Sequence, residues 1–94
     1  MNMKKVSIVV ESLKLKKMYN IIHKSKMPGY TIIPDVGGSG QTGRHDIEEV
    51  SDACRNSLIT IICTPEEADR LTDEVRPIIQ RHGGICFVSN VETI

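Results

Sequence analysis

The sequence has few aromatic residues and no excess of charge of either sign. Tyr19, Tyr30 and Phe87 are its only aromatic residues, and 12 lysines and arginines are balanced by 12 aspartates and glutamates. Proteins that bind single-stranded nucleic acid stack its bases on aromatic side chains, and binding to duplexes needs an excess of positive charge. We therefore expect that nucleic acid is not a partner.

Paired cysteines and long hydrophobic runs are missing as well. Cys54, Cys63 and Cys86 have no C-x-x-C spacing, so neither a disulfide framework nor a zinc site is indicated. We interpret Cys63 and Cys86 as buried hydrophobic residues and Cys54, in a polar stretch, as a candidate reactive thiol. The first apolar run, residues 6–10, is too short for a signal peptide or a membrane span. We expect a cytoplasmic protein that is not embedded in a membrane.

The apolar residues follow two different periods along the chain. In residues 5–11 they alternate, as in a half-buried strand, whereas in residues 13–26 they recur every three or four positions, as in an amphipathic helix. Thr64, Pro65 and Glu67 predict a helix start, with a threonine cap, a proline at the first helical position and a glutamate three residues after the cap. The complete prediction is strand 5–11, helix 13–26, strand 30–36, strand 58–63, helix 65–82 and strand 85–91.

Single residues refine this prediction. Ser12 is a candidate cap for the first helix. Pro34 cannot donate to a sheet ladder, so the second strand is expected at a sheet edge or at a bulge. Gly83 and Gly84 are expected to end the second helix.

The order of elements predicts one domain over residues 1–94, of the α+β class. Two βαβ halves form the ferredoxin-like βαββαβ arrangement, a four-stranded antiparallel sheet with both helices on one face. A long loop, residues 37–57, connects the second and third strands. The sheet face without helices would be exposed in a monomer, so association with other copies is expected.

Residues 37–57 hold four of the seven glycines, and their pattern allows several interpretations. Gly38, Gly40 and Gly43 spell G-x-G-x-x-G after a strand, as in dinucleotide-binding domains. Gly38 and Gly43 also have the spacing of a phosphate-binding loop, but Arg44 and His45 replace its lysine and its serine or threonine. Glycine-rich backbone can bind an anion in either case, and a flexible linker is the alternative.

The segment from Gly29 to Gly43, GYTIIPDVGGSGQTG, resembles the PII signalling family, in which the second strand runs into the mobile T-loop. Residues 6–17 are similar to the first strand and helix entry of that family, and residues 83–88 to its B-loop and last strand. The resemblance implies a homotrimer with nucleotide clefts between subunits, in which residues 37–57 are the flexible T-loop. The nucleotide-binding residues it implies are Thr31, Gly37, Gly38, Ser39, Gly40, Gln41, Gly83 and Gly84, with Arg44 or Arg81 contacting phosphate or another anion.

Departures from the family pattern limit the range of effectors that we expect. The B-loop lysine is absent because Ile85 follows Gly84 directly, and no tyrosine occurs in residues 37–57. The chain is therefore more similar to the PII-like proteins associated with carboxysomes and bicarbonate transport. The resemblance implies that AMP, ADP or ATP, or bicarbonate, is bound as an effector, with no required cofactor. A membrane transporter or a cytosolic enzyme would meet the loop through Ile47, Glu48, Glu49 and Val50.

Two other function classes compete with this one. A CutA-like trimer would bind metal or assist a transporter, but the loop residues His45, Asp46, Glu48 and Glu49 have no diagnostic metal-ligand spacing. A small dinucleotide-binding enzyme is the second alternative. No nucleophile, base and orienting group occur together in the sequence, so we expect a binding protein and not an enzyme.

Overall fold

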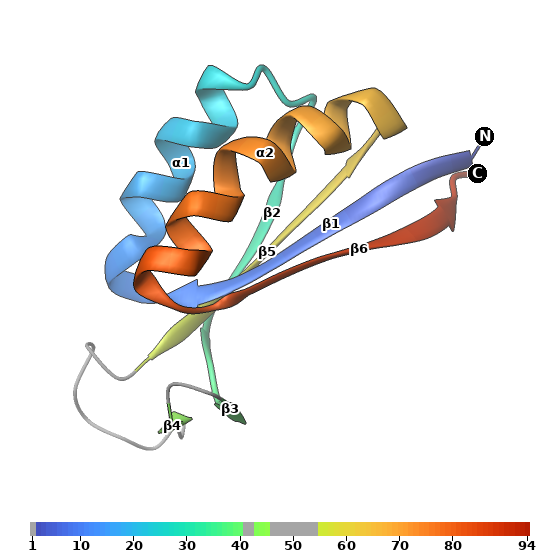
Figure 1. The fold of residues 1–94 in the computed structure, drawn as a ribbon. Coiled ribbons are helices and arrows are strands. Elements are labelled where there is room, and N and C mark those ends of the chain that lie inside the picture. Colours follow the sequence, from blue (N-terminus) through green and yellow to red (C-terminus); the bar gives the residue numbers. More distant parts are fainter. Residues whose placement is uncertain (1, 41–42, 46–54) are drawn as a thin grey trace.

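Figure 1 shows the computed structural model of the protein, which describes residues 2–40, 43–45 and 55–94. Its elements are β1 (Asn2–Glu11), the 3-10 helix η1 (Ser12–Lys14), α1 (Leu15–Lys24), β2 (Thr31–Val36), β3 (Gly38–Gly40), β4 (Gly43–His45), β5 (Asn56–Cys63), α2 (Pro65–His82) and β6 (Ile85–Glu92).

Four of the strands form an antiparallel sheet in the order β2-β5-β1-β6. Both helices lie on one face of this sheet (Figure 1). The two middle strands come from different halves of the chain, so neither βαβ half can form the sheet alone. The predicted ferredoxin-like α+β fold is confirmed.

The core lies between this sheet and the two helices. Along β1, Val6 and Ile8 are fully buried and Val10 is 2% exposed, because the alternate positions of a strand face the same side. Ile59 of β5 pairs with Ile8 of β1 and is also fully buried. The helices contribute further buried residues, Met18 and Ile22 from α1 and Ala68, Leu71 and Val75 from α2.

The two described cysteines belong to this apolar environment. Cys63 is fully buried at the end of β5, and the partly buried Cys86 packs against the core. Burial raises the pKa of both thiols, which keeps them protonated and unreactive at neutral pH. Their interpretation as hydrophobic residues is supported, whereas Cys54 lies outside the described residues.

β1 begins at Asn2, three residues earlier than the sequence predicts. Its pairing with β6 continues through Met3 and Val91 to Asn2 and Glu92. The Lys4 ammonium also donates a hydrogen bond to the Asn90 side chain across the two strands. The polar residues at this end have no alternating pattern, so only the partner strand reveals the extension.

The start of α2 agrees with the sequence prediction. The Thr64 hydroxyl accepts a hydrogen bond from the Glu67 amide at 3.2 Å, and the Glu67 carboxylate accepts one from the Thr64 amide at 2.9 Å. The hydrogen bond from the Thr64 backbone lowers the pKa of Glu67, because it stabilises the ionised carboxylate. The reciprocal capping box is therefore complete.

The start of the first helix differs from the prediction. Ser12 lies inside η1 and does not cap α1, whose first residue is preceded by Lys14 with no side-chain cap. The Ser12 hydroxyl instead lies 2.8 Å from the Ser57 hydroxyl, and the Ser12 amide donates to the Arg55 carbonyl at 2.8 Å. Ser12 thus ties the end of β1 to the start of β5.

The face of the sheet without helices has an apolar row across all four strands. Ile33, Leu58, Val9 and Ile85 are successive partners from β2 to β6. Ile33 is 50% and Ile85 54% exposed. We call this surface, together with Phe87, which is 48% exposed, the open sheet face.

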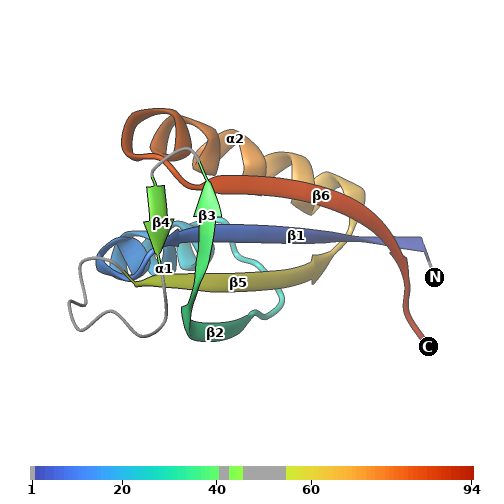
Figure 2. The same ribbon diagram turned by 90° about the horizontal axis from the view of Figure 1, so that it is seen from below.

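Residues 37–57 contain a short hairpin that the sequence did not predict. Gly38 pairs with His45 and Gly40 with Gly43 in a separate two-stranded sheet, and β5 begins at Asn56. Figure 1 shows the hairpin on the side of the main sheet opposite the helices, and Figure 2 shows β3 running from the end of β2 in front of β5 and β1 towards β6. Glycine has low strand propensity, so composition alone favours a loop here. The predicted flexibility of the segment stays a prediction.

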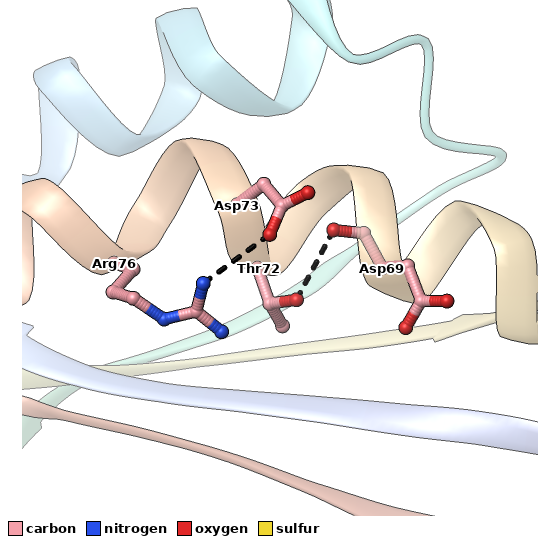
Figure 3. Close-up of polar contacts among 4 residues, drawn as sticks. All are labelled: Asp69, Thr72, Asp73 and Arg76. Carbon is pink, nitrogen blue, oxygen red and sulfur yellow. Dashed lines mark hydrogen bonds and ion pairs between the residues drawn. The ribbon is translucent and has the colours of Figure 1, made fainter.

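Replacing Thr64 with alanine should lower the free energy of unfolding by about 1 kcal/mol, because the first amides of α2 lose their acceptor. Thr72→Ala is the matched control. Its hydroxyl donates to the Asp69 carbonyl within the same helix (Figure 3). Urea denaturation of both variants measures the difference, and equal losses would show that the capping box does not stabilise the helix start.

Candidate effector-binding site

The end of β2 is shaped by a bulge. The pairing of β2 with β5 shifts register between Ile33 and Val36, and this interval contains Pro34, which cannot donate to the ladder. Asp35 has a φ of 58°, a conformation that aspartate tolerates better than most residues. The prediction of an edge strand or a bulge at Pro34 is confirmed, since β2 has both, and the bulge sets the direction in which the chain enters β3.

An ion pair joins the two chain segments at the base of the hairpin. Asp35 Oδ2 at the end of β2 lies 3.5 Å from Arg55 Nη1, one residue before β5. The side chains are 46% and 31% exposed, respectively. Neither Asp35 nor Arg55 was among the predicted site residues. The available signal was a pair of opposite charges at the two ends of residues 37–57, which must meet if β2 and β5 pair in antiparallel fashion.

The turn between α2 and β6 requires its two glycines. Gly83 has a φ of 84° and Gly84 a φ of 102°, which favours glycine strongly. A Cβ on Gly84 would lie 2.6 Å from the backbone oxygen of Val9, so β6 can join β1 only through a residue without a side chain. The prediction that these glycines end the helix is confirmed. The Gly83 amide donates to the Ile79 carbonyl at 2.9 Å, so the predicted anion contact of this turn now depends on Gly84.

Positive charge gathers beside this turn. Arg81 is exposed in the last turn of α2 and is followed by the partly buried His82. Burial lowers the pKa of His82, and the charges of Lys14, Lys17 and Arg81 lower it further. His82 is therefore neutral at pH 7, while the three neighbouring cations provide a positive field at this end of the helices.

The predicted site residues do not form one cluster within a single chain. Thr31 begins β2, at one edge of the sheet, whereas Gly83 and Gly84 precede β6, at the other edge. Three strand spacings separate the edges, about 14 Å. Gly37 and Gly38 follow the far end of β2 and are exposed. Ser39, Gly40 and Arg44 lie in the hairpin strands, while Gln41, Ile47, Glu48, Glu49 and Val50 lie outside the described residues.

The interpretation as a dinucleotide or phosphate-loop domain is wrong. Both motifs require the glycines to lead from a strand of a parallel sheet into the N-terminus of a helix. Here Gly38 and Gly40 lie in a strand that pairs with β4, and the main sheet is antiparallel. The glycine spacing therefore has a different structural origin.

Within the described residues no group of three or more histidine, cysteine, aspartate or glutamate side chains could hold a metal ion. Asp46, Glu48 and Glu49, considered above as metal ligands, fall outside them. In the same described part of the chain, no helix is both long and apolar enough to cross a membrane.

Comparison with protein families gives a match over nearly the whole chain. The family described as nitrogen regulatory protein P-II matches residues 3–94. The chain belongs to the P-II family. No curated protein sequence matches this P-II chain.

Solved structures share the fold of this P-II chain. CPII, a nitrogen regulatory PII-like protein from Thiomonas intermedia K12, has a TM-score of 0.89 at 20% identity, covering 99% of this chain and 89% of CPII. That structure contains ADP, AMP and bicarbonate. A PII-like signaling protein from Thermus thermophilus has a TM-score of 0.83 at 27% identity, covering 100% and 91% of the two chains. The apo form of CPII has a TM-score of 0.78 at 19% identity, covering 99% and 92%.

Gly84→Ala should destabilise the P-II chain by about 2 kcal/mol or more, since its Cβ meets a backbone oxygen and its φ is positive. Gly38→Ala is the matched control, because nothing lies within 4 Å of the added Cβ. It should change stability by less than about 0.5 kcal/mol. Thermal unfolding of the two variants compares them, and a Gly84→Ala protein as stable as Gly38→Ala would contradict the close packing of the turn.

Proposed function

We propose that this P-II chain is a regulatory protein that binds an adenine nucleotide, AMP, ADP or ATP, in clefts between the subunits of a homotrimer, with bicarbonate as a further effector. The segment 37–57 then controls a partner according to the bound effector. The partner is a membrane transporter or a cytosolic enzyme of inorganic-carbon uptake or fixation, and the protein acts in the cytoplasm.

One observation carries the proposal of clefts between subunits. Thr31 and Gly84 lie at opposite edges of the same sheet, so one chain cannot place both against a single nucleotide. In a closed ring of identical subunits, the β2 edge of one copy can face the β6 edge of the next. The two halves of the site then meet at each boundary, and three subunits, the number implied by the PII resemblance, form three equivalent clefts.

The open sheet face supports this assembly. Its central row contains Ile33, Leu58, Val9 and Ile85, none of which is fully buried within the chain. Exposed apolar surface of this kind is stabilised by contact with other subunits. Packing three such faces toward a common axis would bury the row and leave the helices outside.

The charges near the glycine turn support an anionic effector. Arg81, with Lys14 and Lys17 nearby, places positive charge beside Gly84, where backbone amides can contact phosphate oxygens. CPII, which shares the fold, binds ADP, AMP and bicarbonate. An adenine nucleotide combines the required negative charge with a base that Thr31 can contact through its hydroxyl.

The placement of the hairpin supports the proposed regulatory role. The hairpin continues past the end of β2, beyond the main sheet (Figure 1), and we propose that a partner reaches it there. Its base is joined to β5 and to β2, the edge strand that borders the proposed cleft. Ligand binding there can change which hairpin conformations a partner meets, so no catalytic step is required. Ile47, Glu48, Glu49 and Val50 remain the proposed partner contacts.

Isothermal titration calorimetry with AMP, ADP, ATP and bicarbonate tests the effector. We expect saturable heat with at least one adenine nucleotide, approaching one nucleotide per chain because each ring boundary contains one cleft. CMP serves as the control for recognition of the base. Absence of saturable heat with every adenine nucleotide would overturn the proposed function.

Ile33→Glu should disrupt the trimer, because it places a charge in the apolar row of the open sheet face. Leu13→Glu is the matched control, since Leu13 is 64% exposed in η1, away from that face. Sedimentation velocity should show a trimer for the wild type and Leu13→Glu, and smaller species for Ile33→Glu. A wild-type monomer, or an Ile33→Glu trimer as stable as the wild type, would contradict the assembly.

A further inference from the structure

The Asp35–Arg55 ion pair connects the two ends of the segment 37–57. It spans the point where β2 ends and β5 begins, with 3.5 Å between Asp35 Oδ2 and Arg55 Nη1. The Arg55 backbone is fixed by its carbonyl, which accepts the Ser12 amide at 2.8 Å. Arg55 is therefore anchored to the rigid sheet, whereas Asp35 belongs to the bulge that leads into the hairpin.

The chemistry of this pair makes it exchangeable. Both side chains are partly exposed, and an exposed ion pair contributes little stability because water screens it. A phosphate group has more charge and more acceptor oxygens than a carboxylate, and its geometry suits two parallel hydrogen bonds from a guanidinium. A phosphate that reaches Arg55 can thus replace Asp35 as its partner.

The neighbouring backbone gives an anion access to this position. Val36 of β2 pairs with Asn56 of β5. In the backbone, Arg55 therefore lies close to Gly37 and Gly38, just past the ends of the paired strands. Both glycines are exposed, and a Cβ added to Gly38 would meet no atom within 4 Å. An anion could contact this backbone and the Arg55 guanidinium together.

We propose that Asp35 is an internal competitor for the effector anion: its carboxylate holds Arg55 in the unliganded protein, and the phosphate of the bound nucleotide takes its place. This inference rests on the proposed function and adds Arg55 to Arg44 and Arg81, the arginines that the family resemblance implies as anion contacts. Release of Asp35 removes a constraint on the bulge before the hairpin. The exchange can therefore alter the segment that meets the partner whenever the ligand binds.

Calorimetry with Asp35→Asn and Arg55→Gln tests the competition. Asparagine tolerates a positive φ as well as aspartate does, so Asp35→Asn removes the competing charge and keeps the bulge. It should tighten AMP and ADP binding by about two- to fivefold, the range set by an exposed ion pair. Arg55→Gln should weaken both by about tenfold, the effect of losing a charge-assisted hydrogen bond. Adenosine, which has no phosphate, should bind all variants equally.

The Arg76–Asp73 ion pair supplies the matched control. It also has one charged atom pair, 3.3 Å apart, and lies exposed on α2 (Figure 3). Asp73→Asn changes the net charge as Asp35→Asn does, but Asp73 is not one of the proposed site residues. It should therefore leave nucleotide affinity within about twofold of the wild type.

The outcomes separate this inference from the proposed function. If the wild type binds no adenine nucleotide, the proposed function fails and the competition falls with it. If the wild type binds AMP or ADP, but Asp35→Asn matches Asp73→Asn or tightens adenosine equally, the competition alone is overturned. Should Arg55→Gln fail to fold, Asp35→Asn decides the question by itself.

Discussion

The structure depends on one packing constraint: two helices cover only one face of a four-stranded sheet. The covered face forms the core, in which Ile8 and Ile59 are fully buried. The other face keeps an apolar row, and the edges, β2 and β6, have no partner strand within the described part of the chain. A small domain gains much of its stability from apolar burial. The surface left open on this chain is therefore also the surface through which copies of it can associate.

The strand order of this sheet explains how the proposed site is divided. A β2-β5-β1-β6 order puts the start of the second strand and the glycine turn before the last strand on opposite edges. In the proposed function, Thr31 and Gly84 therefore contribute to one cleft only from neighbouring subunits. In the proposed function, ligand binding and assembly therefore involve the same boundary between subunits, and the Asp35–Arg55 contact lies at the base of the hairpin beside the β2 edge.

The sequence predicted the elements that bury apolar residues, because hydrophobic period and capping chemistry are local. The alternating residues of β1 and the Thr64 capping box are of this kind. It did not predict the early start of β1, the role of Ser12 or the β3–β4 hairpin, since each depends on a partner segment distant in the chain. The family resemblance indicated Gly83 and Gly84, whereas Arg55 became visible only when the antiparallel pairing placed it beside Asp35.

A crystal structure of the protein grown with ADP tests the central claim most directly. The account predicts electron density for the nucleotide at each subunit boundary, with Thr31 of one subunit and Gly84 of the next on either side of it. Nucleotide enclosed by residues of a single chain, or an ADP complex in which the open sheet face remains in solvent, would contradict it.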